Sequence, residues 1–352
     1  MLAAVNTGRD GTFFDAELSE LEALVQAAGA EVGGRIVQRR NAVDPATLLG
    51  EGKVTELAAK VDAAGADAVI TLNPLRPRQR SALEKRLGPD VSVFDRSVVI
   101  LDIFTRHART SEGKLQVELA QLRHRAANLI GSRDELSRLG GGIGTRGPGE
   151  TRLEVDRRRI RLRIAHLESQ LSDVRKRRRE QRRGREGTPV VALVGYTNAG
   201  KSSLLNALSG ARVYVADQPF ATLDPTLRRV ALPELDAIFS DTVGFISGLP
   251  KELLAAFRAT LEEVTSAALL VHVVDASNPL WRRQRESVEG ILKELDAAHK
   301  PTLIAWNKVD LLGSDPGDAG IAVSAKTGAG VAELKAAIGA ALLRLQPKRP
   351  RA

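Results

Sequence analysis

The sequence predicts an α/β protein in three successive parts: an N-terminal α/β subdomain, a long antiparallel helical hairpin and a doubly wound α/β domain. Short apolar runs alternate with amphipathic segments at both ends of the chain, and two heptad-like series of aliphatic residues lie between them. A glycine-rich turn also follows an apolar run in the C-terminal half. We place the parts at 1–110, 111–187 and 188–346, followed by a basic tail at 347–352.

The composition is that of a globular protein and excludes several other classes. The chain has 352 residues, of which 43% are hydrophobic and 27% are charged. It contains no cysteine, which excludes disulfide scaffolds, thiolate metal sites and cysteine nucleophiles. No apolar run approaches the roughly 20 residues of a membrane span, and the N-terminal residues do not resemble a signal peptide. We therefore expect a cytoplasmic protein.

The positive charge is concentrated in one segment. Of the net charge of +9, +8 lies in residues 151–187, whereas residues 1–150 are neutral. Residues 175–185 alone contain eight lysines and arginines. This concentration indicates a polyanionic partner, such as nucleic acid, contacted by a single element. The alternative is a solvated helix face that ends in a basic linker.

The first 108 residues predict a small, mostly parallel sheet covered by helices. The expected strands are 32–37, 68–72 and 91–94, and the expected helices are 18–28, 53–64, 76–87 and 96–108. The glycines of the segment Gly50–Lys53 could hold a phosphate, but the start of a helix is the favoured interpretation.

The middle of the chain predicts two helices that bury aliphatic stripes against each other. The first stripe is Leu115, Leu119, Leu122, Ala126 and Leu129, and the second is Ile160, Ile164, Leu167, Leu171 and Val174. The glycine-rich segment 131–149 joins them, although two packed helices need only about 2–8 connecting residues. We expect a functional tip at 140–149, with Arg146 directed at a phosphate or base. A connector without contacts is the alternative.

A phosphate-binding loop is predicted directly after the apolar run 190–194. The segment 195–202 reads GxxxxGKS, and an amphipathic helix follows it. In this motif the backbone N–H groups face the β-phosphate, Lys201 reaches the β- and γ-phosphates, and the Ser202 hydroxyl binds Mg²⁺. The expected binding residues are Gly195, Tyr196, Thr197, Asn198, Ala199, Gly200, Lys201, Ser202 and Ser203.

Two predicted switch segments follow the loop. The segment 241–244 reads DxxG at the end of an apolar run, so Asp241 can hold Mg²⁺ through water and the Gly244 N–H can meet the γ-phosphate. Upstream, Thr222 is the expected second Mg²⁺ ligand, with Thr226 as the alternative. The expected switch residues are Phe220, Ala221, Thr222, Leu223, Asp224, Asp241, Thr242, Val243 and Gly244. We assign catalytic roles to Lys201, Thr222 and Gly244.

Two further segments predict recognition of guanine. An apolar run ends in NKxD, where the Asp310 carboxylate can accept hydrogen bonds from guanine N1–H and N2–H₂. A later segment supplies a backbone N–H toward guanine O6. The expected base-binding residues are Asn307, Lys308, Val309, Asp310, Ser324, Ala325 and Lys326. Because these motifs occur in the required order, each at the end of a predicted strand, the chain is predicted to bind and hydrolyse GTP.

Phe245 occupies the position where many GTPases place a glutamine that orients the attacking water. A phenylalanine side chain has no hydrogen-bond donor or acceptor. We therefore expect slow hydrolysis that a docking partner completes, or a catalytic residue elsewhere in the chain.

Six segments together resemble the HflX family of translation-factor-related GTPases. They are EGKLQVELAQL at 112–122, GGGIGTRGPGE at 140–150, GYTNAGKS at 195–202, FATLDPT at 220–226, DTVGF at 241–245 and NKVD at 307–310. The resemblance implies an N-terminal α/β-plus-hairpin domain joined to a P-loop GTPase domain. It also implies binding to the large ribosomal subunit and its RNA, splitting of ribosomes under stress, and acceptance of ATP beside GTP in some members.

Asn198 is similar to the P-loop asparagine of potassium-activated GTPases, which implies a K⁺ ion beside the phosphates. The alternative is an asparagine that caps the loop. For the whole protein, the alternative to a ribosome-splitting GTPase is a ribosome-assembly or RNA-binding factor that uses GTP only to time its release. A membrane-docked GTPase is less favoured because no lipidation motif accompanies the basic segment. We expect a monomer without a membrane anchor.

Overall fold

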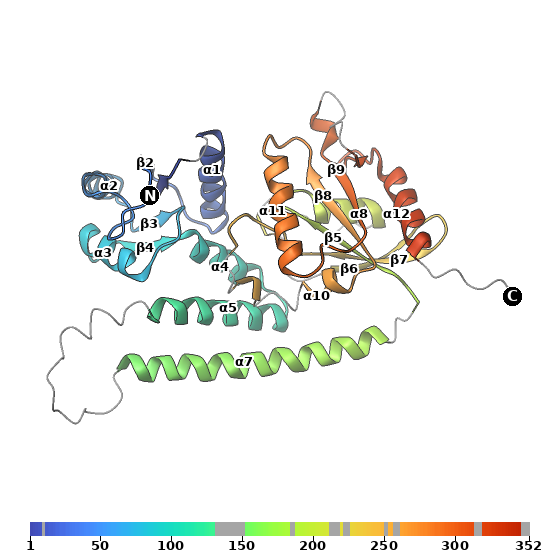
Figure 1. Ribbon diagram of the computed structural model, residues 1–352, viewed down its shortest axis with the longest axis horizontal. Coiled ribbons are helices and arrows are strands. Elements are labelled where there is room, and N and C mark those ends of the chain that lie inside the picture. Colours follow the sequence, from blue (N-terminus) through green and yellow to red (C-terminus); the bar gives the residue numbers. More distant parts are fainter. Residues whose placement is uncertain are drawn as a thin grey trace. The chain divides into compact units, whose positions relative to one another are not determined.

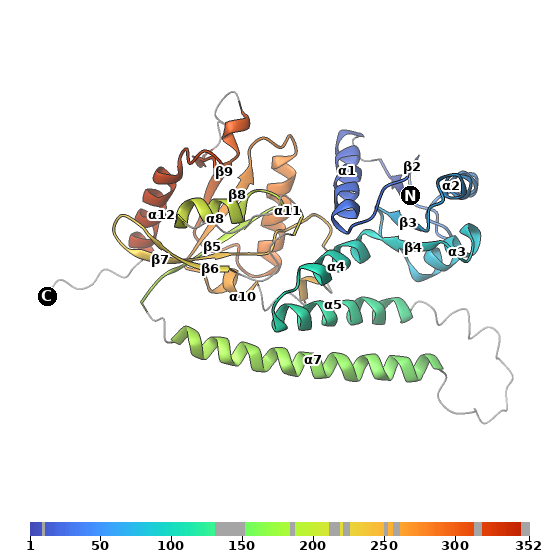
Figure 2. The ribbon, with the colours of Figure 1, turned by 180° about the vertical axis from the view of Figure 1, so that it is seen from behind.

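The computed structural model (Figures 1 and 2) describes residues 1–8, 11–130, 152–183, 187–210, 219–220, 226–249, 253–255, 261–312 and 319–345. The chain divides into two compact units. The first combines Met1–Arg106 with Leu115–Gln170, and the second combines His107–Lys114 with Leu171–Ala352. The four sequence segments with boundaries near residues 110, 187 and 346 remain a prediction.

The first unit contains a four-stranded parallel sheet in the order β2-β1-β3-β4. Its strands are β1 (Leu2–Asn6), β2 (Arg35–Arg39), β3 (Ala68–Thr71) and β4 (Ser92–Asp95). Its helices are α1 (Gly11–Ala27), α2 (Glu51–Ala64), α3 (Pro77–Leu87) and α4 (Arg96–His107). The prediction of a small parallel α/β subdomain is therefore confirmed.

The strand β1 was not predicted, although it lies inside the sheet between β2 and β3. Its sequence is Leu-Ala-Ala-Val-Asn, and all five residues are buried. A strand that is covered on both faces shows no alternation of apolar and polar residues, and alanine is a weak strand former. The helix α2 begins at Glu51 after Gly50, which confirms a helix start at the Gly50–Lys53 segment.

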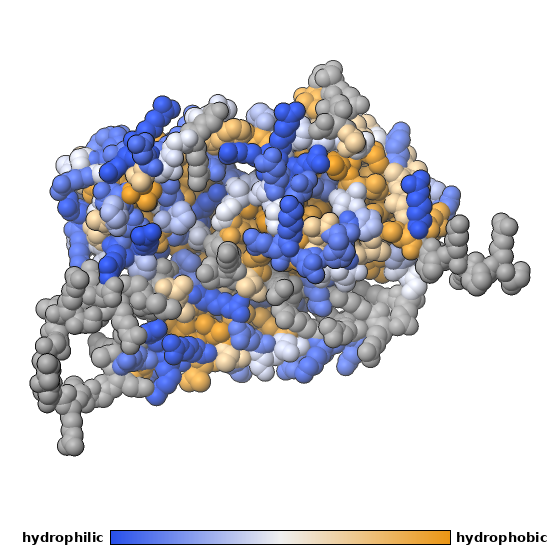
Figure 3. Space-filling view, viewed as in Figure 1, coloured by the Kyte–Doolittle hydropathy of each residue, from blue (hydrophilic) through white to orange (hydrophobic). Residues whose placement is uncertain are grey.

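The helices α5 (Ser111–Ile130) and α7 (Arg152–Arg183) run side by side in opposite directions (Figures 1 and 2), as the two stripes predict. Within the first unit, Arg163 forms a two-pronged ion pair with Glu118 at 2.7 and 3.0 Å, and Arg123 pairs with Glu168 at 2.7 Å. Figure 3 shows hydrophobic side chains gathered along the line where the two helices meet. The segment 131–151, with the glycine-rich tip, lies outside the described residues.

The burial of side chains on α7 follows the predicted stripe. Ile160, Leu167 and Leu171 are buried, whereas most residues between them are exposed. Leu119 on α5 is also buried. The pairing of two amphipathic helices explains how a helix as polar as α7 is held in place.

The second unit contains a six-stranded sheet in the order β10-β9-β8-β5-β7-β6. The strands are β5 (Val190–Gly195), β6 (Thr226–Ala231), β7 (Asp236–Asp241), β8 (Leu269–Asp275), β9 (Thr302–Asn307) and β10 (Ile321–Ala322). All neighbours are parallel except β6 and β7. The helices are α8 (Lys201–Ser209), α10 (Glu262–Ser266), α11 (Trp281–Glu294) and α12 (Val331–Leu345), with a short 3₁₀ helix at Val309–Leu311.

Helices cover both faces of this sheet, as expected for a doubly wound fold. The residues of α8 and α12 share one hydrophobic core with the strands, and α11 packs on the opposite face. The chain winds from β5 toward β7 and then crosses back to β8, so the order of strands reverses beside β5. Ligands of such folds bind at the carboxyl ends of the strands near this reversal. None of the described helices combines the length and apolar composition needed to cross a membrane.

Candidate nucleotide site

The predicted phosphate-binding loop joins β5 to α8 at the carboxyl edge of the sheet. Residues Val191–Val194 of β5 are buried in the core, so the strand holds the start of the loop in a fixed position. Gly200 has a φ of +88°, and a Cβ there would collide with the side-chain amide of Asn307. A Cβ at Gly195 would likewise collide with the carbonyl oxygen of Val273. Only glycine fits such close approaches, and the loop leads into a helix N-terminus that favours anions.

The side chain of Lys201 folds back over this loop. Its Nζ donates hydrogen bonds to the carbonyl oxygens of Gly195 at 3.2 Å and Tyr196 at 3.0 Å. Burial lowers the pKa of the Lys201 ammonium to about 8, although the charge of Asp241 acts in the opposite direction. A phosphate placed at the loop would favour the charged ammonium and raise this pKa again.

Ser202 and Asp241 come together from two elements. The Ser202 hydroxyl, in the first turn of α8, donates a hydrogen bond of 2.5 Å to the carboxylate of Asp241 at the end of β7. A hydroxyl and a carboxylate are oxygen ligands that Mg²⁺ accepts, and the ion completes its shell with water and phosphate oxygens. No group of three or more acidic, histidine or cysteine side chains that could hold a metal occurs among the described residues. The Ser202–Asp241 pair thus fits a metal shared with a phosphate ligand.

Hydrogen bonds tie the loop to the chain that follows β7. The Thr197 N–H donates to the carbonyl oxygen of Phe245 at 2.6 Å, and the Phe245 N–H donates to that of Gly195 at 3.1 Å. We call these two bonds the P-loop bridge. Beside them, the hydroxyl oxygen of Tyr196 accepts the Ser247 N–H at 3.0 Å and lies 3.0 Å from Ser247 Oγ. The loop and the second predicted switch segment therefore form one hydrogen-bonded unit.

The DxxG segment itself is packed tightly against the loop. A Cβ at Gly244 would lie 2.9 Å from Thr197 Cα and 3.2 Å from Lys201 Nζ. The Thr242 hydroxyl donates to the carbonyl oxygen of Leu193 at 2.7 Å and is buried, as is Val243. This arrangement brings the Gly244 backbone next to the lysine, where the γ-phosphate contact is predicted.

The first switch is described only in part. Phe220 has a φ of +59°, and its N–H donates to the Thr197 hydroxyl at 3.2 Å. Thr226, the alternative metal ligand, begins β6 opposite Asp241 in the antiparallel register. The remaining predicted residues Ala221, Thr222, Leu223 and Asp224 lie outside the described ranges. The role of Thr222 stays a prediction.

Asn307 connects the predicted base-binding segments to the phosphate-binding loop. Its Nδ2 donates to the carbonyl oxygen of Ala199 at 2.8 Å, and its Oδ1 accepts the N–H of Ala325 at 3.0 Å. The side chain is buried. The asparagine of the NKxD motif thus fixes two loops at once, which is a structural role beside any contact with the base.

Asp310 is exposed at the carboxyl edge of the sheet, and one of its two carboxylate oxygens accepts a hydrogen bond. The Ser324 hydroxyl donates to Asp310 Oδ1 at 2.6 Å, while Ser324 Oγ accepts the Thr327 N–H at 3.1 Å. Val309 and Ala325 are half-buried beside them, and Lys326 is exposed. The carboxylate that we expect to read guanine is therefore oriented by a serine from the last predicted segment.

Lys308 has a φ of +64°, and its Nζ forms an ion pair of 2.7 Å with Asp275 at the end of β8. Next to it, the buried Trp306 packs edge-on against Trp281, with ring centroids 4.8 Å apart. Arg282 lies 5.0 Å from the centroid of the Trp281 ring. An aromatic pair thus supports the strand that carries Asn307.

Asn198 and Ser203 complete the predicted loop residues. Asn198 is exposed and has a φ of +59°, a left-handed conformation that asparagine tolerates. Its side chain makes no hydrogen bond with the part of the chain that the structure describes. Ser203 is half-buried in the first turn of α8.

Sequence reasoning missed the residues that hold the site from outside the motifs. Ser247 and Asp275 belong to no motif, and the orienting role of Ser324 was not predicted. A polar residue at the end of an apolar run is a signal for Asp275. No pattern in the sequence predicts the contact of Ser247 with Tyr196, because 51 residues separate them.

Comparisons with known proteins agree with this architecture. Three family models match successive segments: "GTP-binding GTPase N-terminal" at residues 15–105, "GTP-binding GTPase Middle Region" at 107–185 and "50S ribosome-binding GTPase" at 190–308. Among solved structures, the crystal structure of SsGBP in complex with GDP aligns with a TM-score of 0.51. It covers 98% of this chain and 99% of that one at 23% identity, which supports the fold.

Two relatives establish the family. The GTPase HflX of Caldanaerobacter subterraneus subsp. tengcongensis is 49% identical over 326 residues, which covers 91% of this chain and 76% of that protein. The GTPase HflX of Escherichia coli is 47% identical over 330 residues, with coverages of 90% and 77%. The chain therefore belongs to the HflX family and is a GTPase.

Proposed function

We propose that this GTPase binds the large ribosomal subunit through the α5–α7 hairpin and uses its GTP cycle to split or rescue ribosomes under stress. The observation that carries the proposal is the hairpin itself: two long helices joined by cross-helix ion pairs, with a strongly basic second helix. The match of the second unit to a model described as "50S ribosome-binding GTPase" supports the choice of partner. A role on ribosomes would place the protein in the cytoplasm.

The arginines of α7 supply the charge for RNA binding. Arg159, Arg161 and Arg177 are exposed, so their guanidinium groups are available to phosphates. Arginine binds phosphate with two parallel hydrogen bonds, and each neutralised phosphate releases counterions. The Arg163–Glu118 pair instead joins the two helices of the hairpin, so this arginine is not counted among those available to phosphates.

For the nucleotide cycle, we assign the phosphates to Lys201 and the loop, the guanine base to Asp310, and Mg²⁺ to Ser202 and Asp241 with Thr222. When bound, Mg²⁺ neutralises charge on the phosphates. Lys201 adds a further positive charge, and we assign to the exposed Asn198 a K⁺ ion beside the phosphates, with a loop-capping role as the alternative. Phe245 is buried and contributes no polar group. We therefore assign the completion of hydrolysis to the docked ribosomal particle.

The decisive experiment distinguishes a GTPase that splits ribosomes from an assembly factor that uses GTP only to time its release. Purified 70S ribosomes are mixed with catalytic amounts of the protein and GTP, GDP or a non-hydrolysable GTP analogue, and light scattering follows dissociation. We expect several rounds of splitting per protein with GTP. Co-sedimentation with separate subunits should then show binding to the large subunit in the GTP-like state. An assembly factor would bind precursor particles and split no ribosomes, which would refute the proposal.

A further inference from the structure

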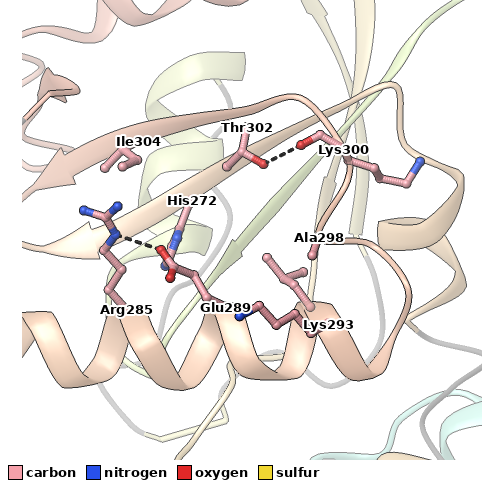
Figure 4. A pocket seen from close by; sticks show the side chains of 9 residues that line it. His272, Arg285, Glu289, Lys293, Ala298, Lys300, Thr302 and Ile304 are labelled. Carbon is pink, nitrogen blue, oxygen red and sulfur yellow. Dashed lines mark hydrogen bonds and ion pairs between the residues drawn. The ribbon is translucent and has the colours of Figure 1, made fainter.

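A cavity of about 330 Å³ lies between α11 and the strands β8 and β9 of the second unit (Figure 4). Its polar lining is His272 on β8, Arg285, Glu289 and Lys293 on α11, Lys300 in the segment before β9, and Thr302 at the start of β9. None of the residues assigned above to GTP takes part in this lining. The cavity is thus a separate feature of the GTPase unit.

His272 is the most unusual residue of this cavity. Its side chain is only 3% exposed and points from β8 toward α11 (Figure 4). Burial lowers its pKa to about 4, so the imidazole is neutral near pH 7, with one N–H donor and one acceptor nitrogen. No hydrogen bond reaches the imidazole from any described residue. The ring nitrogens therefore keep their hydrogen-bonding capacity for a ligand that enters the cavity.

The lining of the cavity as a whole carries more positive than negative charge, although the charged group that acts most strongly on His272 is the Glu289 carboxylate. Arg285 donates from Nε to Glu289 at 2.9 Å, so Glu289 is already neutralised while the terminal guanidinium nitrogens of Arg285 remain for another acceptor. Lys293 is exposed at the same side, and Lys300 donates to the carbonyl oxygen of Ala267 at 2.7 Å. Three cations and one carboxylate leave the lining with a formal charge of +2.

We propose that this cavity binds a small phosphate monoester, with the phosphate facing His272 and Arg285. A phosphate monoester carries a charge of about −1.5 to −2 at pH 7, which matches the charge of the lining. The cavity is larger than a free phosphate requires and reaches the lower end of the range, about 300–1,000 Å³, that small-molecule sites occupy. Leu292, Ala298 and Ile304 complete the wall. They give the organic part of the ligand an apolar surface.

The site also adjoins the nucleotide loop through the sheet. His272 is paired with Val194 in the register of β8 and β5, one residue before Gly195. The positive charge of Lys201 already contributes to the low pKa of His272. An anion in the cavity would therefore act on the same electrostatic environment as the phosphates of GTP.

The test uses the full chain saturated with Mg²⁺ and GDP, so that the phosphate-binding loop is occupied. Ribose 5-phosphate, glycerol 3-phosphate and AMP are titrated in by calorimetry, with inorganic phosphate and ribose as the two partial ligands. We expect at least one phosphate monoester to bind at one site per chain. Its affinity should be higher than that of inorganic phosphate or of ribose alone. We also expect the pKa of His272, followed by NMR of its imidazole, to rise on binding. The groups that face this ring are Glu289 and Arg285 from α11 and Lys201 across the sheet.

Variants assign the binding to this cavity. Arg285→Ala removes a partly exposed side chain and should weaken the monoester about tenfold or more, whereas Arg283→Ala, on the same helix but outside the lining, should not. Basal GTP hydrolysis should be equal in both variants. The proposal is wrong if no monoester binds at millimolar concentration, if Arg285→Ala leaves the affinity unchanged, or if the monoester competes with GDP. Equal affinity for inorganic phosphate would contradict the role of the apolar wall.

Discussion

The backbone N–H of Thr197 donates a hydrogen bond of 2.6 Å to the carbonyl oxygen of Phe245. Thr197 lies in the phosphate-binding loop, and Phe245 directly follows the segment whose Gly244 is expected to meet the γ-phosphate. The Thr197 hydroxyl also accepts the N–H of Phe220 from the first switch. One loop residue is thus hydrogen-bonded to both predicted switch segments, so we expect a ligand that moves either segment to act on this residue.

The strength of the P-loop bridge can be tested with Tyr196→Phe. The change removes the hydroxyl that contacts Ser247, and the loss of such a hydrogen bond costs about 1 kcal/mol. We expect faster amide hydrogen exchange at Phe245, whose N–H takes part in the bridge. Ser209→Ala removes a hydroxyl bond within α8 and serves as the control, since it should leave exchange at Phe245 unchanged.

Guanine selectivity should depend on Asp310. In Asp310→Asn, the side chain offers one acceptor and one donor in place of two acceptors, which disrupts a pair of hydrogen bonds worth a few kcal/mol. We expect a loss of GTP preference and a gain for xanthosine triphosphate, measured by competition with a fluorescent nucleotide. Ser324→Ala should weaken GTP binding less, because it removes only the group that orients Asp310. Unchanged GTP affinity in Asp310→Asn would exclude this carboxylate as the base-reading group.

Nucleotide affinity should fall with rising pH because of Lys201. Its pKa in the free protein is lowered to about 8, and bound phosphates raise it. Below this pKa the ammonium is charged in both states, so affinity is level. Above it the free protein has lost the proton, so binding must take one up and affinity decreases. Calorimetry in two buffers of different ionisation enthalpy, near pH 7 and near pH 9, measures this uptake.

The matched variant for this prediction is Lys201→Arg. A guanidinium stays charged throughout this range, so whatever affinity remains should no longer change with pH. A wild-type affinity that is level between these pH values would show that Lys201 does not lose its proton in the free protein.

Binding to the large subunit should weaken steeply with salt. If six arginines contact phosphates, raising the salt concentration from about 50 to 200 mM should lower the affinity about a thousandfold. Charge reversal at Arg159, Arg161 and Arg177 should reduce both the affinity and the salt slope, measured by co-sedimentation, and leave GTP affinity intact. Arg344→Glu, on the exposed face of α12, is the control. A flat salt response would indicate a protein interface instead.

The glycine-rich tip should be needed for splitting and dispensable for GTP binding. Replacing residues 140–149 by a serine–glycine linker of equal length keeps the reach of the loop but removes Ile143, Arg146 and Pro148. We expect normal GTP affinity, together with a loss of ribosome dissociation measured by light scattering. If splitting and ribosome-stimulated hydrolysis persist at wild-type rates, the tip is only a connector, and the function belongs to the basic end of α7.

The sequence predicts the parts of the site that depend on local chemistry. The GxxxxGKS and NKxD motifs each lie in a few consecutive residues at the end of an apolar run, and both lie where the pattern predicts. The hairpin was predictable because its stripes repeat with a helical period. In contrast, the hydrogen bond between Thr197 and Phe245 joins backbone groups. Every residue other than proline has the same backbone groups, so the residue types at these positions do not indicate the contact.

The strand β1 shows a second limit. Its small, wholly buried residues have neither the alternation nor the β-branched composition that reveals a strand, so only its neighbours in the sheet identify it. The ion pair of Lys308 with Asp275 was equally hard to predict, because Asp275 lies on β8 and is distant from Lys308 in the sequence. Such residues can be recognised only after the strand order is known.

The packing of Trp281 against Trp306 has a practical consequence. The chain contains only two tryptophans, and these are the two that touch. All of the intrinsic indole emission of the protein therefore originates next to Asn307, the residue that ties the base-binding segments to the phosphate-binding loop. The protein carries its own optical probe of that junction, so we expect the tryptophan emission to change when nucleotide binds or leaves, without an attached dye.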